Sequence, residues 1–476
     1  MTSAVDYPQT DHGNGLRFAD AAKGKMLWTP AHGWLRWSDG VWVPTQTDDA
    51  ALQLARRVAV GIAAEALALS DVPPAGSKVS AQDARLKWCE QSQNVARLRA
   101  MAEVARGSRW IAEDSAAFDR TPGVLNTPAG VMHLGTGKVT KHTPTQRHLK
   151  RTRAAPMPAD EYASALMGST WYRFLRWAMR GDYSLIDYLQ AAVGASLVGD
   201  GRCQHVFFCH GGGGNGKGAF ERALSHALGG YCHALPRAFL EQRRGIAPAS
   251  DEYNLAHMQG ARMCIGSEVG RGAAWDEAKV KQLSGGDTIT GRHPYGRPFE
   301  ISPTWVLWVL GNDRPSVEGT DASMWRRLRL IPWLADILQT PDEEKLPPDF
   351  EDQLQVEAPI VLRWAQDGAA RWLQTRTLPA CDAVDNATDE YREAEDVIGR
   401  ALEELIEVTG NDADRVKCVE LTTAVVEWCK ARSISARSMD RRLADYMPRL
   451  GATKVKSSVM MWSGVKMTAD APPRWP

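Results

Sequence analysis

The chain has 476 residues, which is too many for one ordinary hydrophobic core and predicts two to four domains. Its 57 Lys and Arg balance its 57 Asp and Glu, so any contact with nucleic acid has to come from local basic patches. No apolar run reaches membrane-spanning length and the eight cysteines form no C-x-x-C pair, so we expect reduced thiols in a protein of the bacterial or host cytoplasm that contacts no membrane.

Residues 1–155 predict a mainly helical N-terminal domain that also contains a β-hairpin. In KMLWTPAHGWLRWSDGVWVP, three tryptophans flank the turn signal Ser38-Asp39-Gly40. We interpret this aromatic face as structural. Helical periodicity is present over 48–69 and 81–105.

A basic run follows between Met132 and Arg153. It contains six Lys or Arg and no acid, hence a local charge of +6. Such a run is typical either of a solvated connector or of a collar that faces DNA, and the pattern leaves both interpretations open. Helices predicted over 158–198 then form the cover of the next domain.

The segment HVFFCHGGGGNGKGAF (205–220) predicts an apolar strand, a glycine loop and a helix. Glycines take positive φ without a Cβ clash, so successive N–H groups of such a loop curl around a phosphate, while Lys217 and the helix N-terminus add positive charge. The spacing from Gly211 fits G-x-x-x-x-G-K. A glycine-rich loop with an incidental lysine is the alternative. The residues expected to bind phosphate are Gly211, Gly214, Asn215, Gly216, Lys217 and Gly218.

In many proteins with a phosphate-binding loop, two positions carry side chains that hold magnesium, and both positions lack a suitable side chain here. Gly218 stands where Ser or Thr is expected, and Ala219 cannot replace it. The strand RMCIGSE (262–268) ends in Glu268, the candidate for polarising the attacking water, and Ser267 precedes it where a metal-orienting Asp is common. We assign no protein ligand to a metal and expect Mg²⁺ to be held mainly by phosphates and waters. For Glu268 the alternative is a solvent-facing carboxylate.

Residues 279–303 are basic and turn-rich, and they alternate like two strands around the tip RHPYGR (292–297). Cations and a stacking ring at such a tip fit insertion into a nucleic-acid channel. An ordinary exposed hairpin carries charge as well, so the pattern does not distinguish it from a hairpin that contacts nucleic acid.

Two further strands carry candidate catalytic residues. The strand over 304–312 ends in Asn312, an amide suited to orient water or to contact a terminal phosphate. The stretch SMWRRLRLIPW places Arg326 and Arg327 before an apolar strand, where an arginine at a subunit edge reaches a neighbour's phosphates. One of the two arginines is alternatively a structural ion-pair partner.

The C-terminal region ends in a helix and two strands. An amphipathic helix over 352–372 precedes a boundary near 379, and helices are predicted over 388–408 and 417–431. The helix and two short strands predicted over 436–467 have winged-helix order, and eight Lys or Arg face three Asp from residue 433 onward. A basic domain of this kind binds DNA or contacts protein, and both remain open.

Together these residues resemble the helicase region of phage and plasmid primases, which are superfamily 3 helicases related to the poxvirus-type primase-helicase. The motifs are GGGGNGK (211–217), the strand ending in Glu268, VKQLSGGDTITGR (280–292), LGNDRP and MWRRLRLIPW (324–333). The resemblance extends through FDRTPGVLNTPAGVMHL and DYLQAAVGASLVG upstream and DEYREAEDVIGRAL downstream, and so covers nearly the whole chain.

The resemblance implies an α/β fold with an AAA+ P-loop NTPase core, a mainly helical N-terminal domain and a C-terminal winged-helix domain. The expected boundaries are 1–155, 156–200 for the helical cover, 201–378 for the ATPase and 379–476. It further implies ATP and Mg²⁺ as cofactors, a homo-oligomeric ring that is commonly a hexamer, and single-stranded and double-stranded DNA as partners, with movement from 3′ to 5′.

By the same resemblance, residues take family roles. The catalytic residues would be Glu268, Asn312, Arg326 and Arg327, with one arginine acting in trans. The DNA-facing hairpin would carry Lys281, Arg292 and His293. The family's pre-helicase segment begins by about Thr10, so we expect no primase domain and no primer synthesis, with a separate primase as a candidate partner.

Three functions compete at this point. The leading one is an ATP-dependent, ring-forming DNA helicase in the replication of a phage, plasmid or integrated element. The alternative is an ATP-regulated, origin-binding initiator with little unwinding activity. A third is a catalytically weak structural ATP-binding ring, with which Gly218 and Ser267 are compatible.

Overall fold

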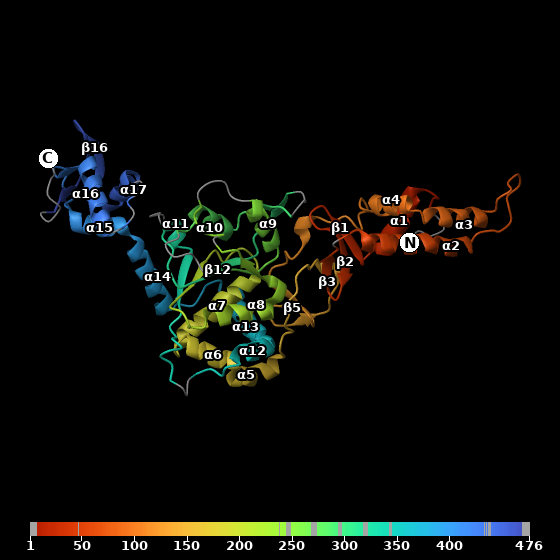
Figure 1. Cartoon of the computed structure of the whole chain (residues 1–476), viewed down its shortest axis with the longest axis horizontal. Coiled ribbons are helices and arrows are strands. Elements are labelled where there is room, and N and C mark those ends of the chain that lie inside the picture. The colour runs from red at the N-terminus through yellow and green to blue at the C-terminus, as the bar shows by residue number, and fades with distance from the viewer. Residues whose placement is uncertain are drawn as a thin grey trace.

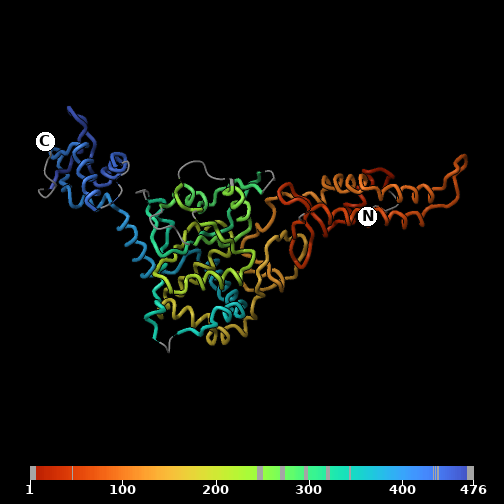
Figure 2. Tube along the Cα trace, in the orientation of Figure 1, coloured from red at the N-terminus to blue at the C-terminus, as the bar shows by residue number. Residues whose placement is uncertain are grey.

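Three parts of the chain follow one another along the long axis of the computed structural model (Figure 1). The structure describes residues 7–45, 47–237, 239–243, 249–267, 274–293, 298–317, 322–341, 345–432, 434, 436 and 439–468. Within these ranges, no helix combines the length and the apolar character that crossing a membrane requires. Figure 2 shows helix α14 (Asp382–Glu395) leading from the central part to the C-terminal part.

The N-terminal part packs helices beside a small antiparallel sheet. The helices are α1 (Asp11–Ala22), α2 (Asp49–Ala66), α3 (Ala81–Ser92) and α4 (Val95–Ala105), and the strands are β1 (Met26–Thr29), β2 (Gly33–Ser38) and β3 (Val41–Pro44). The predicted turn lies between β2 and β3, where Asp39 and Gly40 have φ angles of 48° and 82°. Trp34 and Trp42 are buried, which confirms that these rings serve packing.

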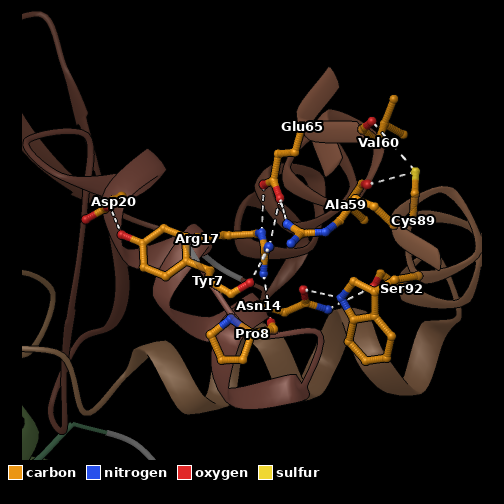
Figure 3. Close-up of polar contacts among 12 residues, drawn as sticks. Tyr7, Pro8, Asn14, Arg17, Asp20, Ala59, Val60, Glu65, Cys89 and Ser92 are labelled. Carbon is orange, nitrogen blue, oxygen red and sulfur yellow. Dashed lines mark hydrogen bonds and ion pairs between the residues drawn. The ribbon is translucent and has the colours of Figure 1, made fainter. Parts of the chain in front are cut away.

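A buried cluster of charges joins three of these helices (Figure 3). Glu65 of α2 accepts two hydrogen bonds from the guanidinium of Arg17, both at 2.7 Å, and also pairs with Arg85 of α3. Arg17 donates in addition to the carbonyl oxygens of Tyr7 and Pro8. The three charged side chains are at most 9% exposed, so the Glu65 carboxylate is the counter-charge that two guanidinium groups with little access to water share.

A three-stranded sheet links this part to the central one. Its strands are β4 (Val124–Thr127), β5 (Gly130–His133) and β6 (Val139–Thr140). Three cations of the basic run after β5 contact the protein itself. Arg147 pairs with Glu113, Arg151 donates to the carbonyl oxygen of Asp39, and burial lowers the pKa of Lys150. Much of the run therefore serves the joint between the parts.

The central part is built on a five-stranded parallel sheet in the order β13-β7-β12-β9-β8. In chain order the strands are β7 (Val206–His210), β8 (Cys232–Leu235), β9 (Met263–Ser267), β12 (Val306–Gly311) and β13 (Leu328–Pro332). Phe207 and Cys209 face one hydrophobic layer, and Val206 and Phe208 face the other, as strand alternation requires.

Helices cover both faces of this sheet. One face packs against α6 (Thr170–Ala178), α7 (Tyr183–Val198), α8 (Lys217–Leu228) and α13 (Ala358–Thr375). The other packs against α9 (Ala249–Met258), α10 (Glu277–Ser284) and α14. The remaining elements are α5 (Ala159–Gly168), β10 (Ile289–Gly291), β11 (Phe299–Ile301), α11 (Ala322–Trp325) and α12 (Phe350–Val356).

The C-terminal part has a hydrophobic core of its own. Its elements are α15 (Val397–Leu405), β14 (Ile406–Val408), β15 (Arg415–Lys417), α16 (Cys418–Ala431), α17 (Met439–Tyr446), β16 (Thr453–Lys456), β17 (Met460–Ser463) and β18 (Val465–Met467). The predicted succession of a helix and two strands is confirmed by α17, β16 and β17. Ala387 and Tyr391 of α14 are buried in the central core, which therefore continues beyond residue 379.

The prediction of a strand over 279–284 is wrong, because these residues belong to α10. Asp276 caps this helix by accepting a hydrogen bond from the backbone N–H of Lys279 at 3.0 Å. Val280 and Leu283 are buried at helical spacing. The hairpin itself is limited to β10 and β11.

Two long predicted helices are interrupted. The segment 352–372 is divided between α12 and α13, since Pro359 has no N–H with which to continue α12. The segment 388–408 is divided at Asp396, whose side chain caps α15 by accepting from the N–H of Gly399.

Candidate nucleotide-binding site

The loop between β7 and α8 has the shape of a phosphate cradle. Gly214 and Gly216 have φ angles of 71° and 89°, in the left-handed region that glycine enters at little cost. A Cβ on Gly216 would lie 2.8 Å from the ring of Phe174 and 3.0 Å from that of Trp177. Both the conformation and the close packing of α6 therefore require glycine at position 216.

Lys217 is the first residue of α8, and its ammonium lies within the loop. Nζ donates to the carbonyl oxygens of Gly211 (2.8 Å) and Gly212 (3.1 Å) and to Oδ1 of Asn215 (3.0 Å). Asn215 is buried and donates to the carbonyl oxygen of Trp333 (3.4 Å), which ties the loop to the end of β13. Burial lowers the pKa of Lys217 to about 8. The loop thus presents a partly desolvated cation beside the N–H groups that begin α8.

A cleft of about 530 Å³ opens from this loop at the carboxyl edge of the sheet. Its polar lining includes residues 213–219 and Asn312, which follows β12. Its apolar lining is formed by Trp177, whose Nε1 donates to the hydroxyl of Thr340 at 3.0 Å, and by residues after β13. These residues are Ile337, Leu346, Pro347, Pro348 and Phe350. An apolar wall that includes the Trp177 ring beside a phosphate cradle suits a nucleotide with its base on the wall.

Sequence reasoning missed an ion pair that also lines the cleft. Arg222 of α8 donates two hydrogen bonds to the carboxylate of Glu351 in α12, from Nε at 2.8 Å and from Nη2 at 2.7 Å. The two residues are 129 positions apart, so no local pattern could have paired them. The apolar wall was missed for the same reason.

The side chains present do not fit a magnesium ion held by the loop. Gly218 and Ala219 have no hydroxyl. Throughout the described ranges there is no group of three or more His, Cys, Asp or Glu placed to hold a metal ion. The expectation of Mg²⁺ as a cofactor therefore stays a prediction from the resemblance.

The predicted catalytic residues are only partly brought together. Asn312 lines the cleft, whereas Glu268 lies outside the described residues. Arg326 and Arg327 precede β13 at the amino edge of the sheet and do not line the cleft of their own chain. Arg327 donates to the carbonyl oxygen of Ser323 at 2.8 Å, while the side chain of Arg326 is exposed.

Of the predicted DNA-binding residues, Arg292 and His293 directly follow β10 of the hairpin, whereas Lys281 lies apart from them. Placing Lys281 on the hairpin was wrong, because it lies on α10 with its Nζ 3.4 Å from the carboxylate of Glu277. Arg292 pairs with Glu252 of α9 at 3.1 Å. The ring of His293 stacks on Phe299 and lies 5.0 Å from that of His32 in the N-terminal part, and burial lowers the pKa of His293. The rest of the predicted tip, 294–297, lies outside the described residues.

Two family models match parts of the chain. Residues 15–180 match the family described as D5 N terminal like. Residues 209–327 match a family of unknown function, DUF5906, and this range contains the loop, Asn312 and the arginine pair before β13. The first range is about a third of the chain and the second about a quarter of it.

Three curated viral proteins that each carry the name Putative helicase are similar to parts of the chain. The one from Acanthamoeba polyphaga mimivirus is 29% identical over 165 residues, covering 34% of this chain and 17% of that protein. The one from Frog virus 3 is 24% identical over 295 residues, covering 58% and 29%. The one from Sputnik virophage is 22% identical over 140 residues, covering 29% and 18%. The chain thus spans less than a third of the length of these relatives.

Solved structures of the NrS-1 C-terminal region are also similar to the chain. The apo structure has 12% sequence identity and a TM-score of 0.41, and the match covers 67% of this chain and 80% of that one. An A form apo structure of the region has the same identity and TM-score and covers 78% and 89%.

Proposed function

We propose that this chain is an ATP-dependent DNA motor of the helicase type that acts in the replication of a phage, a plasmid or an integrated element. The observation that carries the proposal is the cleft, which is lined by Lys217, by Asn312 and by apolar side chains suited to pack against a base. The strand order supports an AAA+ core, since it reads fifth, first, fourth, third, second in chain order, with β12 between β7 and β9. The names of the viral relatives support the helicase class.

In the proposed mechanism the chain binds and orients ATP with its own groups. Lys217 and the first N–H groups of α8 hold the phosphates, and the base lies against Trp177. Asn312 contacts the terminal phosphate. Glu268 is the proposed base, and it directly follows Ser267, which pairs with Leu310 near the end of β12.

In the proposed ring, a neighbouring chain supplies the arginine that the ATP site of a single chain lacks. Arg326 is the better candidate for an arginine that reaches a neighbour's ATP, because Arg327 is held by a carbonyl of its own chain. Turnover would shift the arrangement of neighbouring chains, since ATP binds one arrangement more tightly than the other. In this proposal the residues around β10 and β11 convert that shift into movement along single-stranded DNA, from 3′ to 5′ by the resemblance.

An origin-binding initiator is the second candidate, and the C-terminal part favours it. Exposed cations lie on α17 and on the strand that follows it: Arg441, Lys454 and Lys456. A helix and a β-ribbon with exposed cations suit duplex DNA, where phosphate contacts position the protein. Charge reversal at Lys454 and Lys456 that abolished selection of one DNA sequence, with turnover unchanged, would favour the initiator.

The deciding experiment is ATP hydrolysis with and without single-stranded DNA, in the wild type and in Lys217→Ala. The motor predicts turnover that DNA stimulates and that the variant loses, because the variant has no cation in the loop. Turnover that survives in Lys217→Ala would remove this cleft as the site of hydrolysis. Binding of ATP without turnover would favour the initiator.

A further inference from the structure

The position that lacks the loop hydroxyl is filled by a cation. A Cβ on Gly218 would lie 2.9 Å from Nη1 of Arg222, the residue one turn further along α8. In hydroxyl-bearing loops a Ser or Thr at this position contacts the magnesium ion of the nucleotide. Here the absence of a side chain at 218 leaves room for the Arg222 guanidinium, which also lines the cleft.

The ion pair between Arg222 and Glu351 can open at little cost. The pair formed by Arg222 and Glu351 is 57% and 43% exposed, and exposed pairs of this kind contribute little to stability because water solvates both charges. Two oxygens of a tetrahedral phosphate accept a bidentate pair of hydrogen bonds from a guanidinium as the two oxygens of a carboxylate do, and the phosphate carries more charge. Exchange of one acceptor for the other therefore needs only a rotation of the long arginine side chain.

Resting on the proposed function, we propose that Arg222 is a phosphate-binding residue of this cleft that takes the place of the loop hydroxyl. The nucleoside triphosphate brings a charge near −4, and Lys217 neutralises one unit of it. Arg222 supplies a second unit beside the same phosphates, where other loops rely on a metal ion. The chain consequently binds ATP with little dependence on Mg²⁺. The absence of a hydroxyl-bearing side chain at Gly218 leaves room for Arg222, and Arg222 supplies the positive charge that other loops obtain from a metal ion.

The test is ATP affinity of the full chain, measured by titration calorimetry in excess EDTA and in excess Mg²⁺. The wild type should bind similarly in both. Arg222→Gln should lose about tenfold or more in EDTA, the loss expected for a hydrogen bond to a charged group, and less in Mg²⁺. Glu351→Gln, which frees the guanidinium, should bind in EDTA at least as tightly as the wild type.

Two further variants keep the test specific. Gly218→Ser should displace the flexible guanidinium, restore a hydroxyl and make binding depend on Mg²⁺. Arg371→Gln is the matched control, because Arg371 forms an exposed pair with Asp187 outside the cleft. The ATP affinity of this variant should equal that of the wild type.

The outcomes separate the two levels of the proposal. If Lys217→Ala loses ATP in EDTA and Arg222→Gln does not, the cleft binds nucleotide but Arg222 has no part in it. If the wild type binds ATP only with Mg²⁺, the inference is overturned in the same way. If Lys217→Ala binds as tightly as the wild type under both conditions, the proposed function itself fails.

Discussion

Nucleotide affinity should fall as the pH rises through the pKa of Lys217, which burial lowers to about 8. Bound phosphates favour the charged form and raise this pKa, so binding takes up a proton at any pH where the free lysine is neutral. The protonated fraction of a group with a pKa of about 8 falls from about ten elevenths at pH 7 to about one eleventh at pH 9. The dissociation constant for ATP should therefore rise about tenfold across this interval.

Titration calorimetry checks both the size and the cause of this effect. Near pH 8, heats recorded in two buffers of different ionisation enthalpy should report about half a proton taken up per ATP. Lys217→Arg is the matched control, because a guanidinium stays charged across the whole interval and its affinity should stay flat. Equal affinity of the wild type at pH 7 and pH 9 would refute the reasoning, and an equal slope in the arginine variant would assign the proton to another group.

The remaining predictions concern other parts of the chain. Glu65→Gln should lower the free energy of unfolding of the N-terminal part by about 3–5 kcal/mol in urea denaturation, since two buried guanidinium groups lose their carboxylate, whereas Asp48→Asn at an exposed pair with Arg106 in the same part should change it by less than about 1 kcal/mol. Trp177→Ala should weaken ATP about tenfold but leave inorganic triphosphate unchanged, and an equal loss for both would mean that Trp177 only supports the loop. An equal mixture of Arg326→Ala and Lys217→Ala chains should recover about one quarter of wild-type turnover, because about one interface in four then joins a chain that keeps Lys217 to a neighbour that keeps Arg326. No recovery would count against action in trans.

The loop and its sheet could be predicted from the sequence because their signals are local. An apolar strand, a run of glycines and Lys217 lie within one short segment, and the structure contains β7, the loop and α8 as expected. The segment that contains Lys281 was harder, because its residues fit a strand by alternation and a helix by i, i+3 spacing. Asp276 at the N-terminus of α10 decides for the helix, because its side chain accepts a hydrogen bond from the first turn.

The rest of the cleft could not be predicted from local patterns. Trp177 precedes the loop, and Phe350 and Glu351 follow it by more than a hundred positions, so only the fold brings them to one wall. The same holds for His293, which meets His32 of the N-terminal part. Residues of this kind are identified by what they touch, and a single sequence does not contain that information.

The positions of the cationic side chains divide the proposed reaction between two chains. Lys217 and Arg222 lie at the carboxyl edge of the sheet, whereas Arg326 precedes β13, an edge strand whose five residues span about 17 Å from the amino edge to the carboxyl edge. Binding of ATP draws on the first two charges, which one chain provides. Stabilisation of the charge that develops during hydrolysis requires a guanidinium in contact with the terminal phosphate, and Arg326 does not reach the cleft of its own chain. It follows that a single chain should bind ATP, while turnover per chain should rise with protein concentration.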